Sequence, residues 1–274
     1  MLHAEDLNDE GVSHYKQGEY ETAIEFFDKA LRLDPALAPA WSNRGLALSE
    51  LGRYEDAIES FDRAIQIRPD YILALQAKGV ALCRAGMDVE AVAAYEKALE
   101  IDPQFSAAWI GKGVALYHLR RDEEALECLD KAVQLDPLDA VAWVNRGRVQ
   151  HGLHWLEEAL KSYERAIALD PYYAKAYESK GLSLYDRGDY DEAIEAYDKA
   201  LELDPLFKTA WEGKGVALFE LGRYEEALKC YERAGELNPT DPAIWIKKGL
   251  TLQALGRNSE ANDAMERARG MGAG

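Results

Sequence analysis

The sequence predicts an all-α solenoid built from eight helix–turn–helix repeats, and three observations predict it. Seven of the nine prolines stand 34 residues apart, at Pro35, Pro69, Pro103, Pro137, Pro171, Pro205 and Pro239. With repeats counted from residue 4, glycine occupies position 8 in all eight copies. Alanine occupies positions 20 and 27 in all eight. A period of this length indicates stacked supersecondary units.

The period divides the chain into repeats at 4–37, 38–71, 72–105, 106–139, 140–173, 174–207, 208–241 and 242–274. We expect them to form a single array over residues 4–274. One repeat cannot bury both of its faces, whereas a stack of repeats buries a continuous core.

Apolar residues within each repeat recur at the spacing of two short helices. In the second repeat, Trp41, Gly45 and Leu48 are four and three residues apart, and Ala57 and Phe61 are four apart. Residues at these spacings share one face of a helix. Small residues at positions 8, 20 and 27 let the helices approach closely, and the ring at position 4 or 24 fills the space opposite.

The ends of the two helices are also predicted. Gly52 stands between them in the second repeat and tolerates the positive φ of a tight turn. Proline at position 32 disfavours helix for the residue before it, so the second helix stops there.

The consensus W-x3-G-x2-L…G-x-Y-x2-A-x3-[FY]-x2-A-x4-P resembles the tetratricopeptide repeat (TPR), and the resemblance covers residues 4–274. It implies units that stack into a right-handed superhelix, in which the first helices line a concave groove. It further implies that positions 2, 5, 9, 12 and 13 face into that groove. The carboxylate clamp of this family needs lysine at position 5 and asparagine at position 9 of one repeat. No repeat here has either residue at those positions.

Position 7 departs from the leucine usual in that family. Seven repeats carry a base there: Arg44, Lys78, Lys112, Arg146, Lys180, Lys214 and Lys248. The bases could form a ladder for a polyanion. We favour aliphatic stems that pack along the helix, with charged ends that reach nearby Asp or Glu. Acidic residues outnumber basic ones, 50 against 32, which supports this interpretation.

The first and last repeats are polar where a neighbouring repeat is missing. Residues facing a preceding repeat are Asp6, Glu10, Ser13 and Gln17 in the first copy, and residues facing a following repeat are Asn262 and Arg269 in the last. Terminal repeats need such polar faces. We therefore expect a self-contained protein of eight repeats.

Gly235 occupies position 28 of the seventh repeat, where the other inner repeats have an aliphatic residue. Glycine inside a helix costs roughly 1 kcal/mol relative to alanine. We expect a weakened junction between the seventh and eighth repeats, with faster amide hydrogen exchange there.

The net charge of −18 disfavours nucleic acid and anionic lipid, because both would repel the chain. The three cysteines are far apart in sequence, the chain starts with a polar acidic segment, and no apolar run approaches the roughly 20 residues of a membrane span. These features favour a cytoplasmic protein.

The candidate partner-binding groove consists of groove-facing residues from the middle repeats: Val80, Cys83, Ile110, Val114, Tyr117, Val144, Arg148, His151, Glu178, Leu182, Tyr185 and Phe219. Exposed apolar and aromatic residues of this kind are typical of a site for an amphipathic helix or an extended peptide. In the alternative interpretation, these side chains pack on their neighbours and expose little.

No catalytic residue, cofactor or metal site is predicted. The triplets around Lys112 and Lys214 lie within repeat helices and lack the rest of a phosphate loop. His118, His151 and His154 lack a further ligand at tetrahedral spacing.

Of the cysteines, Cys128 and Cys230 are expected to pack inside second helices, and Cys83 could face the groove without a base to activate it. Trp155 stands at a turn and could make a secondary contact.

The sequence therefore predicts a non-enzymatic scaffold that binds a peptide or helix of a partner protein, basic or amphipathic, in the groove. The default state is a monomer, and a homo-oligomer is possible. Two alternatives stay open: a self-associating structural protein, or a regulatory subunit of a separate enzyme.

Overall fold

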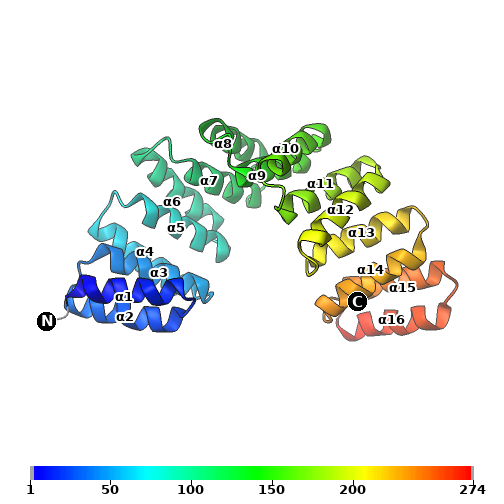
Figure 1. Ribbon diagram of the computed structural model, residues 1–274, viewed down its shortest axis with the longest axis horizontal. Helices are drawn as coiled ribbons and strands as arrows, with labels where there is room; N and C mark the ends of the chain where they lie inside the picture. The colour runs from blue at the N-terminus through cyan, green and yellow to red at the C-terminus, as the bar shows by residue number, and fades with distance from the viewer. Residues whose placement is uncertain (1–2, 273–274) are drawn as a thin grey trace. The chain divides into compact units, whose positions relative to one another are not determined.

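The computed structural model describes residues 3–272, which form helices joined by short turns, without a strand (Figure 1). The helices are α1 (Ala4–Lys16), α2 (Tyr20–Leu33), α3 (Ala38–Glu50), α4 (Tyr54–Ile67), α5 (Ile72–Arg84), α6 (Asp88–Ile101), α7 (Ser106–His118), α8 (Asp122–Leu135), α9 (Ala140–Gly152), α10 (Leu156–Leu169), α11 (Ala174–Arg187), α12 (Tyr190–Leu203), α13 (Lys208–Glu220), α14 (Tyr224–Leu237), α15 (Pro242–Ala254) and α16 (Asn258–Gly270).

Two compact units make up the chain, unit 1 over residues 1–137 and unit 2 over residues 138–274. Each contains four helical hairpins, α1/α2 to α7/α8 in unit 1 and α9/α10 to α15/α16 in unit 2. Within a unit, the second helix of each hairpin packs against the first helix of the next. The predicted class, all-α with eight helix–turn–helix repeats, is confirmed. The single array over 4–274 stays a prediction.

The turn inside each hairpin requires a left-handed residue. Gly52 has φ +72° and Gly188 has φ +95°, as glycine readily allows. In two hairpins the position is taken by Arg120 (φ 61°) and His154 (φ 62°). Side chains rarely adopt this conformation, so these two turns are strained relative to the glycine turns.

The glycine at position 8 allows the two helices of a hairpin to pack closely. A Cβ atom on Gly45 would lie 2.7 Å from the Phe61 ring, closer than real Cβ contacts. The same close approach recurs in the other hairpins, against Phe27, Tyr95, Leu129, Tyr163, Tyr197, Tyr231 and Met265. The predicted pairing of a small residue with a large side chain at position 24 is therefore confirmed.

The Gly-Lys-Gly triplets lie inside helices α7 and α13 and have a packing role. A Cβ on Gly111 would lie 2.3 Å from Cζ of Tyr95, and one on Gly213 would lie 2.4 Å from Cζ of Tyr197. Each tyrosine comes from the preceding hairpin. The first glycine of each triplet thus accommodates a neighbouring ring.

The tryptophan at position 4 joins one hairpin to the next. The indole Nε1 of Trp41 donates a hydrogen bond to the carbonyl oxygen of Pro35 at 3.0 Å, and Trp211 donates to Pro205 at 3.0 Å. Proline follows the end of the second helix, and the indole of the next first helix binds its exposed carbonyl oxygen. The sequence analysis predicted the ring but not this hydrogen bond.

The bases at position 7 form ion pairs with acids 16 residues earlier, on the second helix of the preceding hairpin. Arg44 Nε lies 2.7 Å from Asp28, Lys112 Nζ lies 2.9 Å from Glu96, and similar pairs join Lys78, Lys180, Lys214 and Lys248 to Asp62, Glu164, Asp198 and Glu232. Arg146 donates a hydrogen bond to the Ser162 hydroxyl at 2.9 Å. The interpretation as internal ion pairs is confirmed for these six bases.

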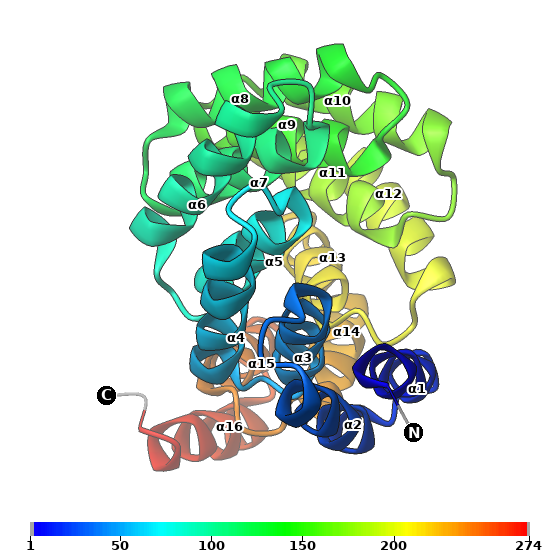
Figure 2. The ribbon, with the colours of Figure 1, turned by 90° about the vertical axis from the view of Figure 1, so that its left-hand side faces the viewer.

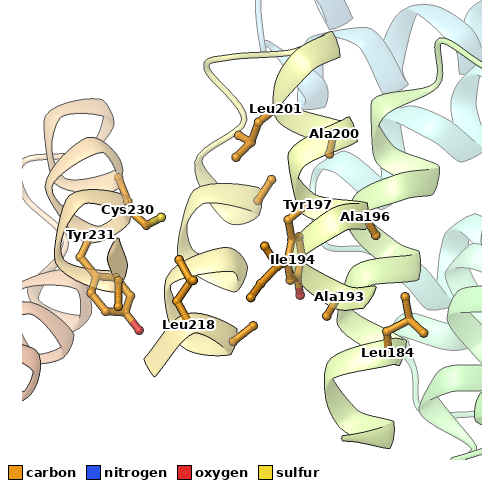
Figure 3. Packing of buried hydrophobic residues seen from close by; sticks show 14 of the residues in the cluster. Leu184, Ala193, Ile194, Ala196, Tyr197, Ala200, Leu201, Leu218, Cys230 and Tyr231 are labelled. Atoms are coloured by element: carbon orange, nitrogen blue, oxygen red, sulfur yellow. The ribbon is translucent and has the colours of Figure 1, made fainter. Parts of the chain in front are cut away.

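Figure 3 shows how the hairpins of unit 2 bury their apolar faces. Leu218 of α13 lies between Tyr231 of α14 and the side chains of Ile194 and Tyr197 on α12. All four are buried. The core is thus a row of layers in which each first helix packs between two second helices.

The polar terminal faces are exposed as predicted. Asp6, Glu10, Ser13 and Gln17 on α1 are exposed, and so are Asn262 and Arg269 on α16.

Helix α14 runs unbroken through Gly235. A Cβ there would lie 3.5 Å from Cγ2 of Ile244, an ordinary contact. Whether the junction is weakened stays a prediction.

Candidate functional site

The first helices of each unit form a shared surface. In unit 1, α1 contacts α3, α3 contacts α5 and α5 contacts α7, and in unit 2, α11 contacts both α9 and α13 (Figures 1 and 2). Across residues 3–272, no two second helices make a contact of similar extent. Each unit therefore has a first-helix surface, defined here as the side chains at positions 2, 5, 9, 12 and 13.

The first-helix surface of unit 1 is apolar on α5 and α7. Val80 on α5 is 40% exposed. Ile110, Val114 and Tyr117 on α7 are half-buried, as is Cys83 on α5. The five predicted residues of this unit therefore all reach the surface, with Val80 the most open.

The Cys83 thiol is not a nucleophile at neutral pH. Burial, followed by the nearby carboxylate of Asp88, raises the pKa of Cys83 to about 12. The same carboxylate contacts Nδ1 of His118 at 3.0 Å. Cys128 and Cys230 are buried in second helices, and burial raises the pKa of each to about 11. All three cysteines are therefore protonated near neutral pH.

Two predicted groove residues of unit 2, Val144 and Glu178, are buried rather than open on the surface. Val144 on α9 is 1% exposed and belongs to a buried cluster with Tyr163 and Ala176. Glu178 on α11 is 8% exposed, and Lys175 Nζ lies 2.8 Å from its carboxylate. Side chains of α10 and α11 cover Val144, and Lys175 of the same helix pairs with Glu178.

The remaining apolar residues predicted in unit 2 are accessible. Leu182 on α11 is 42% exposed. Tyr185 and Phe219, half-buried, each contact the first tyrosine of the following helix, with ring centroids 5.4 Å apart for Tyr185–Tyr190 and 5.1 Å for Phe219–Tyr224. These contacts fix the rings in place. Aromatic residues at both positions 12 and 17 were the sequence signal for such pairs.

Helix α15 carries two further exposed apolar residues at these positions. Ile246 is 38% exposed and Leu250 is 47% exposed. They occupy positions 5 and 9, the same positions from which the candidates were drawn, but the prediction stopped at the seventh repeat.

Carboxylates lie beside the aromatic residues of unit 2. The pKa of Tyr185 is raised by burial first, and then by charges that include Glu220 and Asp186. Asp186 accepts a contact from Nε2 of His151 at 2.7 Å, across α9 and α11. Glu220 is exposed and has no ion-pair partner in the described part of the chain. This end of the surface is therefore acidic.

Two other charged residues on this surface, Glu212 and Arg148, have polar partners close by. Glu212 lies 3.2 Å from Lys208 Nζ and 3.0 Å from Lys247 Nζ. The predicted residue Arg148 is half-buried and donates to Oδ1 of Asn145 at 3.2 Å. Unit 2 thus combines open apolar side chains with an unpaired carboxylate.

Within residues 3–272, no three His, Cys, Asp or Glu side chains gather closely enough to hold a metal ion. None of the described helices is both long and apolar enough to cross a bilayer. Trp155, the residue before α10, is exposed.

Models of the tetratricopeptide repeat match residues 11–52, 38–71, 85–144, 140–173 and 178–242. No curated protein sequence matches the chain.

Solved structures share the fold. A tetratricopeptide repeat protein from Parabacteroides merdae matches with a TM-score of 0.75 at 17% identity, over 91% of this chain and 98% of that one. Cut9–Hcn1, a hetero-tetramer of the APC/C, matches with a TM-score of 0.72 at 18% identity, over 97% of this chain but 52% of that chain. This chain thus spans about half of the latter's length.

A third structure is YrrB, described as a TPR protein with an unusual peptide-binding site. It matches with a TM-score of 0.51 at 26% identity, over 69% of this chain and 97% of that chain.

Proposed function

Because the chain belongs to the tetratricopeptide repeat family, we propose that it is a non-enzymatic scaffold whose first-helix surfaces bind a peptide or helix of a partner protein. The fold is one that implies protein–protein interaction. The proposal goes further and assigns the binding to the open apolar residues on the first helices of each unit.

One observation carries the proposal. On the first helices α11, α13 and α15 of unit 2, Leu182, Phe219 and Leu250 are accessible apolar residues at positions 9, 12 and 9 of three successive repeats. Exposed apolar residues of this kind, with rings fixed by packing, are typical of binding sites for amphipathic segments. The apolar residues around Val80 and Val114 provide a second such surface in unit 1.

The charge beside Leu182, Phe219 and Leu250 favours a basic or amphipathic partner. Glu220 lacks an ion-pair partner in the described chain, and the whole chain carries a net charge of −18. A partner with Lys or Arg next to its apolar anchors would gain electrostatic attraction and faster association. Nucleic acid and anionic membranes would be repelled.

Site-specific photo-crosslinking tests the location of binding. A benzoylphenylalanine residue would replace Tyr185 on the first-helix surface of unit 2, or Tyr172 in the turn before α11 as a matched control. Tyr172 is 81% exposed and lies off the surface. We expect a partner crosslink from position 185 that is absent from position 172. A crosslink from position 172 alone would contradict the proposal.

Charged substitutions test the exposed apolar residues of unit 2. Leu182→Asp combined with Leu250→Asp should weaken partner binding at least about tenfold, equivalent to about 1.4 kcal/mol. The control is Leu206→Asp combined with Tyr172→Asp, two exposed side chains in turns of the same unit. Unchanged binding by the first pair, with melting temperatures equal to wild type, would remove this surface from consideration. A crosslinked homodimer would instead support the self-associating alternative.

A further inference from the structure

A pair of tyrosine rings in unit 2 lies beside an exposed carboxylate. The ring centroids of Tyr185 on α11 and Tyr190 on α12 are 5.4 Å apart. Glu220 is the last residue of α13, the first helix of the next hairpin, which contacts α11. Its charge raises the pKa of Tyr185, second only to burial. Tyr185 and Glu220 are therefore neighbours across two helices.

The charge beside these rings is negative. Asp186 follows Tyr185 on α11 and is a second carboxylate whose charge acts on that ring. Its Oδ2 lies 2.7 Å from Nε2 of His151 on α9. Glu220 is exposed and has no ion-pair partner in the described part of the chain. The rings are thus flanked by one carboxylate that a histidine contacts and one that is open to solvent.

The arginines nearest to these carboxylates in sequence are engaged elsewhere. Arg187 Nη1 lies 2.8 Å from the carboxylate of Glu157, and Arg223 Nε lies 2.7 Å from that of Glu226. Position 13 of the last repeat, which follows Glu220 in the series, is the uncharged Ala254. Glu220 is therefore left available to a cation from outside the chain.

Unit 1 contains the same three residues at equivalent positions. Tyr15 on α1 and Tyr20 on α2 have ring centroids 5.5 Å apart, and Glu50 ends α3, which contacts α1. The charge of Glu50 likewise raises the pKa of Tyr15, after burial. Glu50 is exposed, as Glu220 is. The two rings with their carboxylate thus occur in both units.

The two copies differ in the charges beside them. In unit 1, the position-13 residues on the two helices that contact α3 are bases, Lys16 and Arg84, and both are exposed. The corresponding residues in unit 2 are Asp186 and Ala254. The chain itself therefore places positive charge around Glu50 but not around Glu220. A cation from outside is attracted to the copy in unit 2 and meets like charge at the copy in unit 1.

We propose that the copy in unit 2 binds the guanidinium of an arginine residue in the partner peptide, and that its counterpart in unit 1 does not. This copy, called the Tyr185 site, consists of Tyr185, Tyr190, Asp186 and Glu220. Its role rests on the proposed function, in which the partner lies on the first-helix surface of unit 2. A planar guanidinium stacks on a tyrosine face and pairs with a carboxylate through two N–H groups. The compact ammonium of lysine cannot make both planar contacts, so lysine is the weaker ligand.

The smallest probe of the site is N-acetyl-L-argininamide, compared with N-acetyl-L-citrullinamide, in which a neutral urea replaces the guanidinium. Binding is followed by two-dimensional NMR of the ring signals of ¹³C-labelled tyrosine, with Tyr185 and Tyr15 assigned from Tyr→Phe variants. We expect the Tyr185 signal to shift with an affinity on the order of 1 mM and the Tyr15 signal to stay in place. The citrulline compound should bind at least about tenfold more weakly. Equal binding of the two compounds would overturn the proposal.

Two further compounds define the ligand. N-acetyl-L-lysinamide should bind more weakly than the arginine compound, and equal binding would overturn the choice of arginine. Free L-arginine adds an ammonium and a carboxylate that an internal residue lacks, and we expect no gain from them. Binding of free L-arginine at least about tenfold tighter would assign the site to the amino acid instead of a partner's side chain.

A pair of glutamine variants tests the carboxylate. Glu220→Gln should abolish the preference for arginine over citrulline. Glu225→Gln, an exposed glutamate on α14 of the same hairpin, should leave the preference unchanged. A preference that survives Glu220→Gln would contradict the proposal.

Exchanging the flanking charges between the copies tests why only one of them binds. Asp186→Lys gives unit 2 the base that unit 1 has and should abolish the Tyr185 shift. Lys16→Asp combined with Arg84→Ala gives unit 1 the residues of unit 2 and should make the Tyr15 signal respond to the arginine compound. All of these side chains are exposed, so the circular dichroism spectrum should stay that of wild type. A Tyr15 signal that still does not respond would overturn the role of the flanking charges.

The partner separates this site from the proposed function. Glu220→Gln should weaken partner binding at least about tenfold, and Glu225→Gln should not. Unchanged binding in Glu220→Gln, together with weakened binding in the Leu182→Asp and Leu250→Asp pair, would overturn the Tyr185 site alone. Unchanged binding in both would overturn the proposed function as well.

Discussion

Two successive junctions between hairpins of unit 2 differ in which helix supplies the large side chain. Between the sixth and seventh hairpins, α12 contributes a large residue, Leu201, and α13 a small one, Ala210. Between the seventh and eighth, α14 contributes Gly235 and α15 contributes Ile244. Both junctions bury an aliphatic side chain. The comparison shows that each junction places one large and one small residue opposite each other. Either of the two helices can supply the large one.

The junctions also differ in charge. The residue before α15 is Asp241, which accepts a hydrogen bond from the amide of Ala243 at 3.0 Å and pairs with Lys208 at 2.7 Å. At the preceding junction the equivalent residue is Phe207, which packs against the apolar core. Both junctions have the ion pair of position 7, and the seventh–eighth junction adds the ionised carboxylate of Asp241 where the sixth–seventh junction has an apolar ring.

The largest effect is expected from Ile244→Ala. With glycine opposite, no neighbouring side chain can fill the space, so the loss should be about 2–5 kcal/mol, as for other buried large-to-small changes. The measurement is amide hydrogen exchange of α15 and α16, because repeat arrays open locally at their weakest junction. Ile246→Ala on the same helix, partly exposed, serves as the control and should cost less than about 1 kcal/mol. Equal effects would contradict the pairing with Gly235.

The next largest effect is expected when the glycine–isoleucine pair of the seventh–eighth junction is introduced at the sixth–seventh junction. Leu201→Gly should destabilise strongly, and adding Ala210→Ile should recover part of that loss. We expect a coupling free energy of about 1–3 kcal/mol in a double-mutant cycle, measured by urea unfolding. Additive effects of the two substitutions would show that volume is not shared across the junction.

Acid should weaken the seventh–eighth junction more than its neighbour. The hydrogen bond from Lys208, together with the Ala243 amide, lowers the pKa of Asp241 below its ordinary value of 3.8. A group whose folded pKa is depressed stabilises the fold above its unfolded pKa and loses that contribution as the pH falls through the folded pKa. The stability difference between wild type and Asp241→Asn should therefore be present at pH 6 and smaller at pH 3, below the ordinary pKa of 3.8. A difference that is the same at both pH values would rule out ionisation as its cause.

The smallest effect is expected from Gly235→Ala. The new Cβ would lie at an ordinary contact distance of 3.5 Å from Ile244, so the change should stabilise α14 by about 0.5–1 kcal/mol through helix propensity alone. Hydrogen exchange at the eighth repeat, expected to be the fastest of the inner junctions in wild type, should slow. Uniform protection across the last three repeats of the wild-type protein would contradict the weakness assigned to Gly235.

Much of the candidate site was predictable because position in the repeat fixes which face a residue occupies. Val80, Leu182 and Tyr185 are accessible on the first helices, as their positions predict. Val144 and Glu178 are not, because burial depends on the size and charge of side chains on the adjacent helix. Val144 packs with Tyr163 and Ala176 on two other helices, and no repeat position records which side chains those helices bring.

The sequence by itself determined the hairpins. Glycine at position 8 has no alternative when a ring from position 24 occupies the space above it, and proline at position 32 cannot continue a helix. These are local steric requirements, so a 34-residue pattern records them directly. The tertiary structure decided what lies between hairpins, namely the ion pairs of position 7 and the hydrogen bonds of the tryptophans. Each of these depends on where two helices from different repeats place their side chains, which is fixed only when the repeats pack together.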